Sequence, residues 1–251
     1  MTVTRYPIEI EGETALIGTA GELVAALDVL QGQHDRVVLE QLSPHLADIL
    51  GGPKGLYATL KVLASEDQLF LVEAIGSQLV GVVQTASALR DILATLAESG
   101  VEEKLVEVLG GEGLRTLVGT AEELAGILEW VYGASDWLVL ELLGEPFLRR
   151  IFQNGYELSV VLRALDPARQ QQLIEWLGWE DAVALVHDRR DLAHMLRALP
   201  AGLSNRLLNH LTKDQLWDIV RDERGFQYLH TYLEAEEAQY LAKLLEVDNA
   251  Q

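Results

Sequence analysis

The sequence predicts an all-α protein, a right-handed solenoid of about seven units of 33–35 residues with three short helices in each unit. Three observations support this prediction. A leucine, replaced by phenylalanine in the last unit, recurs once in each unit and forms a ladder along the chain. Further apolar positions recur at the same spacing and form columns, and turn residues lie at fixed places between these columns. Self-similarity at such a period is typical of proteins whose units bury their apolar faces only against neighbouring units. The ladder positions, spaced 33, 33, 35, 34, 34 and 34 residues apart, are Leu23, Leu56, Leu89, Leu124, Leu158, Leu192 and Phe226.

The first helix of each unit contains the ladder position. Residues four and seven places after it are also apolar in almost every unit, and such spacing places side chains on one stripe of an α-helix. The fourth-place column is Leu27, Leu60, Leu93, Leu128, Leu162, Leu196 and, as an exception, His230. The seventh-place column is Leu30, Leu63, Leu96, Val131, Leu165, Leu199 and Leu233.

The second helix of each unit ends on another apolar column. Its members are Leu42, Ile75, Leu109, Leu143, Leu177, Leu211 and Leu245. The next residue is glycine in four units, at Gly76, Gly110, Gly144 and Gly178. Glycine is typical of the left-handed position that follows a helix, so we expect a helix boundary there.

The third helix carries an apolar pair in each complete unit, such as Leu46 with Ile49. In the fifth unit we expect helices over 156–165, 168–177 and 180–187. The units begin near residues 19, 52, 85, 120, 154, 188 and 222, and together they predict one helical-repeat domain over 19–251. An alternative is two helices per unit, with the second and third fused across the glycine.

Residues 1–18 lack the helical pattern. Tyr6, Ile8 and Ile10 alternate with polar residues or proline, which indicates a short strand or hairpin. One interpretation is an extended cap over the first unit. The other is an edge strand that pairs with a partner or a second copy.

Composition limits the class of protein. The chain has no cysteine, so disulfides and thiolate metal sites are excluded, and no apolar segment is long enough to enter a membrane. Because no secretory signal is visible either, we expect a cytoplasmic protein. The net charge is −20, with 7 bases and 19 acids in residues 1–125 and 12 bases and 20 acids in 126–251. Such a surface disfavours direct binding of nucleic acid. The acids either keep the chain soluble or let it act as an inhibitor that mimics nucleic acid.

Aromatic and basic residues concentrate in the middle of the chain. Some aromatics belong to the core, and others are candidate anchors for a partner. Basic pairs recur at Arg149-Arg150, Arg189-Arg190 and Arg221/Arg224, where they either complement helix C-termini or hold an acidic partner segment. The candidate partner-binding residues are Trp137, Phe147, Arg149, Arg150, Tyr156 and Trp179.

No catalytic motif is present, so we expect a protein that is not an enzyme and has no cofactor. His187, Asp191 and His194 share helical spacing and would offer three metal ligands. They span the joint between two units, so we expect solvated side chains there and no metal.

The segments LRALDPARQQQLIEWLGWEDAVALV and LRALPAGLSNRLLNHLTKDQLWDIV, residues 162–186 and 196–220, resemble short-helix superhelical repeats. Such repeats occur in the N-terminal domain of MgtE magnesium transporters and in the flagellar switch protein FliG. The resemblance implies a curved, acidic superhelix that responds to a protein or an ion, and it transfers no functional residue. The predicted solenoid is of the general armadillo and HEAT type. We therefore expect a scaffold or adaptor that binds a partner protein along one face. The alternatives are an acidic inhibitor and a metal-responsive regulatory domain. Partner, pathway and oligomeric state stay open.

Overall fold

The computed structural model describes residues 3–96, 99–131, 133–233 and 235–245, and most of these lie in α-helices. The predicted all-α class is confirmed, with one two-stranded sheet added at the N-terminus. The chain divides into two compact units. The first unit comprises Met1–Gly119 with Gly126–Leu143, and the second comprises Thr120–Ala125 with Gly144–Gln251. The single repeat domain over 19–251 stays a prediction.

The N-terminal segment is a β-hairpin. Strands β1 (Tyr6–Ile10) and β2 (Glu13–Ile17) pair antiparallel, and Glu11 and Gly12 join them with positive φ angles of 52° and 89°. Two positive φ angles in a two-residue loop match the twist of a hairpin. Strand β1 packs on helix α2 (Asp35–Leu42). There the Gln41 side chain accepts from the Glu9 N–H at 2.8 Å and donates to the Glu9 carbonyl at 2.9 Å.

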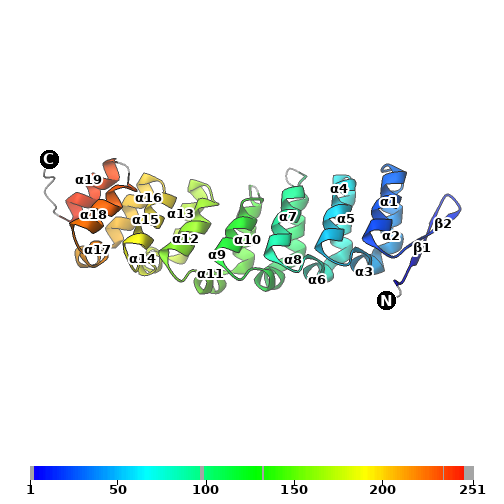
Figure 1. Cartoon of the computed structure of the whole chain (residues 1–251), viewed down its shortest axis with the longest axis horizontal. Helices are drawn as coiled ribbons and strands as arrows, with labels where there is room; N and C mark the ends of the chain where they lie inside the picture. The colour runs from blue at the N-terminus through cyan, green and yellow to red at the C-terminus, as the bar shows by residue number, and fades with distance from the viewer. Residues whose placement is uncertain (1–2, 97–98, 132, 234, 246–251) are drawn as a thin grey trace. The chain divides into compact units, whose positions relative to one another are not determined.

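The first unit is built from helices that pack on helices about one period further along the chain. Helix α1 packs on α4 and α4 on α7, while α2 packs on α5, α5 on α8 and α8 on α10 (Figure 1). The remaining bounds are α1 (Ala20–Leu30), α3 (Leu46–Leu50), α4 (Pro53–Val62), α5 (Ser65–Ile75), α6 (Leu79–Val83), α7 (Ala86–Leu96), α8 (Val101–Leu117) and α10 (Ser135–Leu143). Helix α9 (Ala121–Leu128) has residues in both units.

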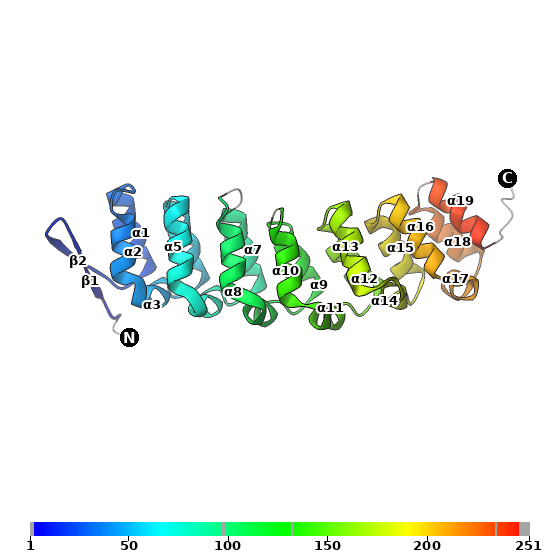
Figure 2. The ribbon, with the colours of Figure 1, turned by 180° about the vertical axis from the view of Figure 1, so that it is seen from behind.

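The second unit follows the same rule. Helix α12 packs on α15 and α15 on α18, while α16 packs on α19 (Figure 2). Helix α14 ends at Ala184, three residues before the expected end. The bounds are α11 (Glu145–Ile151), α12 (Gly155–Arg163), α13 (Pro167–Leu177), α14 (Trp179–Ala184), α15 (Arg189–Ala198), α16 (Ala201–His210), α17 (Lys213–Val220), α18 (Glu223–His230) and α19 (Ala235–Leu244).

The predicted columns form the core. The six ladder leucines are 0% exposed, whereas Phe226, in the last copy, is half-buried. Every member of the column that ends the second helices is buried, including Leu245 at 1%. Two members of the seventh-place column, Leu30 and Leu233, are only half-buried. The leucine pattern therefore identifies the packed face of most helices.

The joint after each second helix has the expected backbone. The four joint glycines have positive φ angles, and Gly110 shows the consequence most clearly, because it lies inside α8 with φ 60° and ψ 178°. These angles are not helical, so α8 is two helices that meet at a kink. A straight fusion of the second and third helices across the glycine is therefore wrong for α8.

A column of buried polar residues was not predicted. One such residue lies near the start of each second helix, at intervals of 33 or 34 residues: Asp35, Gln68, Glu102, Asp136, Gln170, Ser204 and Glu237, all at most 9% exposed.

The amide of Gln170 shows what this polar column does. Its Nε2 donates to the carbonyls of Leu162 and Leu165 at 2.8 and 3.1 Å, and to that of Ala198 at 3.1 Å. Gln68 donates in the same way to Leu60 O at 2.8 Å. Carbonyls at a helix C-terminus have no partner within the helix, so these side chains satisfy groups that burial would otherwise leave unpaired.

Candidate functional site

The six predicted partner-binding residues are divided between the two units. Trp137 lies in the first unit, where its indole N–H donates to Glu141 at 2.6 Å, and the other five lie in the second unit. The contacts of these five residues differ, and they show which side chains pack within the fold and which are exposed to solvent.

Phe147 is not an exposed anchor. Its side chain is 5% exposed because it occupies an inward position one residue before Leu148 in α11, and the Arg150 guanidinium lies 4.7 Å from the centre of its ring. The sequence prediction for Phe147 is wrong in this respect. Arg150 stays exposed, but its cation covers an aromatic ring of its own helix.

Arg149 is engaged within the fold. It binds Glu145 at 2.8 Å and Asp181 at 2.7 Å, and it donates to the Leu177 carbonyl at 2.6 Å. Hydrogen bonds to Glu145 and then Asp181 hold the pKa of Arg149 above its ordinary value. Arg115 donates similarly to the carbonyls of Leu143 and Leu142, both at 2.8 Å. Both arginines therefore complete the C-terminus of a neighbouring helix, and Arg149 is not free to bind a partner.

Trp179 is half-buried and covered by two side chains of α16. The His210 ring stacks on it at 5.2 Å with an interplanar angle of 5°, and the Arg206 guanidinium lies 4.7 Å from its ring. Arg206 also pairs with Glu175 at 3.2 Å. This arrangement joins α13, α14 and α16, so Trp179 acts first as a packing residue.

The side chain of Tyr156 is 39% exposed. It belongs to a surface that was not predicted from the sequence. It is the second residue of α12, and the second residues of α15 and α18 are Arg190 and Arg224. The ninth residues of α12 and α15 are Arg163 and Arg197. We call this surface the arginine face: Tyr156, Arg163, Arg189, Arg190, Arg197, Arg224, Tyr228 and Tyr232.

Contacts between neighbouring helices hold the arginine face together. Arg189 lies 5.5 Å from the Tyr228 ring and Arg197 lies 5.4 Å from the Tyr232 ring, both at distances typical of cation–π contacts. The two tyrosine rings meet edge to face at 5.0 Å. Burial raises the pKa of Tyr228, as does Tyr232, while Arg190 and Arg189 act in the opposite direction. Within the described residues, none of the five arginines forms an ion pair.

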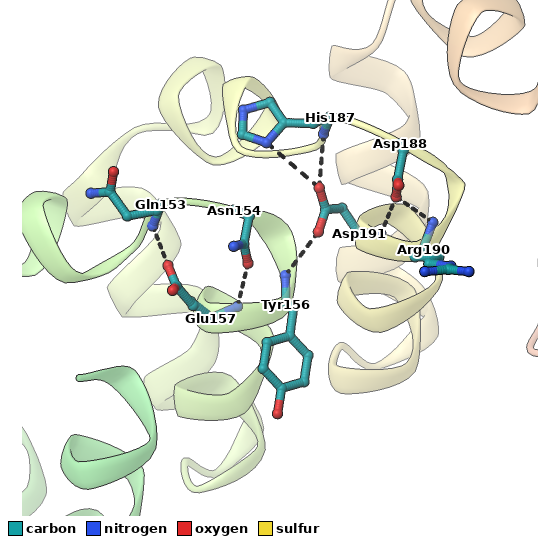
Figure 3. Close-up of polar contacts among 8 residues, drawn as sticks. All are labelled: Gln153, Asn154, Tyr156, Glu157, His187, Asp188, Arg190 and Asp191. Atoms are coloured by element: carbon teal, nitrogen blue, oxygen red, sulfur yellow. Dashed lines mark hydrogen bonds and ion pairs between the residues drawn. The ribbon is translucent and has the colours of Figure 1, made fainter.

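The carboxylates at the start of α12 and α15 accept hydrogen bonds from backbone N–H groups (Figure 3). Asp191 accepts from the N–H of Tyr156 at 3.3 Å and from that of His187 at 3.1 Å. Asp188 accepts from the N–H groups of Arg190 and Asp191 at 2.7 and 3.0 Å. Figure 3 shows the Arg190 guanidinium and the Tyr156 ring pointing away from this network. The arginines are therefore left without carboxylate partners there.

Glu157 completes this pattern at the start of α12. Its carboxylate accepts from the Gln153 N–H, while the Asn154 side chain accepts from the Glu157 N–H at 3.0 Å (Figure 3). An acid in the first turn of a helix is favourable with the helix dipole. These side chains stabilise the joint. Their signal in the sequence is a polar residue before a first helix followed by an acid three places on, which occurs at four first helices: Thr19/Glu22, Thr120/Glu123, Asn154/Glu157 and Asp188/Asp191.

The three residues with helical spacing, His187, Asp191 and His194, do not surround a common point. His187 Nδ1 lies 3.7 Å from Asp191, whereas the ring of His194 packs edge-on against Tyr156 at 5.0 Å. Across the part of the chain that the structure describes, no group of three or more histidine, aspartate and glutamate residues is placed to hold a metal ion.

The first unit has a groove on the corresponding helices, α4 and α7. It is an open groove with a volume of about 620 Å³, and its lining includes Lys54, Tyr57, Asp91 and Ile92. Asp91 pairs with Arg90 at 2.9 Å, and Lys61 lies 5.3 Å from the ring of Tyr57, which is 37% exposed. Exposed tyrosine beside cations thus occurs on these helices in each unit considered separately.

Comparisons with family models, with curated proteins and with solved structures found no match to this chain. Among the described residues, no helix has the length and apolar character needed to cross a membrane.

Proposed function

We propose that this chain is a right-handed α-solenoid of about seven three-helix units that works as a non-enzymatic, cytoplasmic scaffold. Its partner is a segment of another protein, laid across neighbouring first helices. The packing pattern supports the solenoid, because α1, α4 and α7 in one unit and α12, α15 and α18 in the other each pack on the next helix of the series. Packing of this kind leaves one side of each series open to solvent.

The observation that carries the proposal is the composition of that open side. Elsewhere the surface is dominated by acids, since the chain has 39 acids and 19 bases. On α12, α15 and α18, however, unpaired arginines stand next to exposed tyrosines. Tyrosine and arginine, with tryptophan, are the residues enriched at the positions that contribute most to binding. A surface that only had to stay soluble would not need either of them in this arrangement.

The proposal is tested by photo-crosslinking in the native cell extract. A photoreactive phenylalanine analogue replaces Tyr156 in the full chain, and a second variant carries it at Trp217, which is 38% exposed on α17. We expect a discrete crosslinked protein from position 156 and none from position 217. Two further variants carry the analogue at the exposed residues Tyr57 and Tyr232. If none of the variants at positions 57, 156 and 232 gives a discrete crosslinked product, the scaffold function is wrong.

A further inference from the structure

The arginine face carries positive charge where helix electrostatics oppose it. Arg189 and Arg190 are the first two residues of α15, and Arg224 is the second residue of α18. The N-terminus of a helix has a partial positive charge, which favours acids and disfavours cations. The interpretation that these basic residues complement helix C-termini is therefore wrong for these three positions, although it holds for Arg149 and Arg150 in the last turn of α11.

No carboxylate of the described residues pairs with these charges. Asp188 and Asp191 are bound to backbone N–H groups, as is Glu157. Glu223, the first residue of α18, is an exposed acid next to Arg224, but the two form no ion pair. The side chains of Arg163, Arg190 and Arg224 also form no hydrogen bond within the described residues. Their guanidinium groups thus keep all of their donors for a ligand.

We propose that the arginine face binds an acidic segment of a partner protein. Aspartate and glutamate side chains of the segment pair with Arg163, Arg190, Arg197 and Arg224, because the planar guanidinium matches a carboxylate in two parallel hydrogen bonds. An apolar side chain of the segment packs against Tyr156 or Tyr232. This inference rests on the proposed scaffold function and names the chemistry of its partner.

The size of the surface favours a short peptide segment over nucleic acid. Neighbouring packed helices lie roughly 10 Å apart, so three helices present about 20 Å, the length of about six extended residues. A longer polyanion would run onto the rest of a chain whose net charge is −20. Repulsion there opposes nucleic acid, whereas a short acidic segment stays within the arginine face.

The test uses the full chain and a fluorescein-labelled peptide of four Glu-Glu-Leu repeats, with Gln-Gln-Leu and Lys-Lys-Leu peptides as comparisons. We expect the glutamate peptide to bind most tightly. The double substitution Arg190→Glu with Arg197→Glu should weaken its binding by about tenfold or more, because two attractive pairs become repulsive. The matched control is Arg221→Glu with Lys243→Glu, which changes net charge equally at exposed positions outside the face. It should change binding by less than about twofold.

Three outcomes of the peptide experiment would overturn the inference. The glutamine peptide binds as tightly as the glutamate peptide, or the control pair weakens binding as much as the test pair, or a twelve-residue oligothymidylate binds more tightly than either peptide. Circular dichroism of each variant distinguishes a loss of binding from a loss of folded structure. If the protein crosslinked at position 156 has no acidic segment, this inference is wrong but the proposed scaffold function still holds.

Discussion

At the scale of single residues, Asp35 occupies a position where two other second helices carry a neutral amide. Gln68 and Gln170 donate hydrogen bonds to helix-end carbonyls from this buried column, whereas an ionised carboxylate has nothing to donate. Asp35 is 2% exposed, and its Oδ1 has no hydrogen-bond partner within the described residues. Burial raises the pKa of Asp35 above the ordinary 3.8, Asp67 raises it further, and a hydrogen bond from the Gly32 N–H lowers it.

The variant Asp35→Asn should therefore be more stable than the natural chain at pH 7, by about 1 kcal/mol, because it removes the cost of a buried charge with one unsatisfied oxygen. Since the folded pKa lies above the unfolded one, the ionised carboxyl destabilises the fold at neutral pH. This cost shrinks as pH falls through the raised pKa. The advantage of the variant, measured by urea unfolding, should be largest near pH 7 and smaller towards pH 4.

The control for this prediction is Asp28→Asn, an exposed aspartate on α1. It should leave the free energy of unfolding nearly unchanged, as surface substitutions usually do. Equal effects of the two substitutions would mean that Asp35 is not held in an unfavourable charged state.

At the scale of helices, the start of α12 lies very close to the start of α15. A Cβ atom placed on Gly155 would stand 2.8 Å from the Asp191 Cβ and 3.0 Å from the Asp191 carbonyl oxygen. Asp191 cannot move away easily, because its carboxylate holds the N–H groups of Tyr156 and His187. Glycine at position 155 is thus required by close approach between two helices.

Gly155→Ala should destabilise the protein by about 1–3 kcal/mol, since overpacking at a rigid contact forces the backbone to shift. Gly202→Ala in α16 is the matched control, because a Cβ there meets open space. Alanine is favoured over glycine inside a helix, so the control should be neutral or slightly stabilising. Thermal unfolding of the two variants measures the contrast, and a loss of the same size in both would refute the close-contact argument.

At the scale of the whole molecule, the dominant property is a net charge of −20. Like charges repel within the folded chain, and dissolved salt screens that repulsion. The acids are dispersed over many helices, and within the described residues they form no cluster suited to a metal ion. Stability should therefore respond to ionic strength and not to the identity of the cation.

Raising NaCl from low to moderate concentration should raise the melting temperature, and MgCl2 or CaCl2 should raise it no more than NaCl of matched ionic strength. Differential scanning calorimetry provides the measurement. A divalent-specific rise that is lost in His187→Ala, a change at an exposed side chain, would favour the metal-responsive alternative instead.

Much of the candidate site could not be predicted from the sequence. Tyr156 is exposed, and its role as an anchor stays a prediction. The sequence pattern alone could not distinguish the buried Phe147 from a surface aromatic. The carbonyl partner of Arg149 lies 28 residues further along the chain. The column of buried polar residues was not predicted because its members differ in side-chain chemistry. Its regular spacing of 33 or 34 residues was the available signal.

The sequence by itself determined which faces of the helices are buried and where most helices end. Those features depend on local chemistry repeated at a fixed period: leucines on one stripe, and glycines at joints that need a positive φ. The tertiary structure alone decided which polar groups are occupied. Arg149 and Asp191 are held by backbone atoms, while Arg163, Arg190 and Arg224 are left without partners. Such pairing depends on which helices become neighbours in space, and a side chain's own sequence surroundings do not encode that.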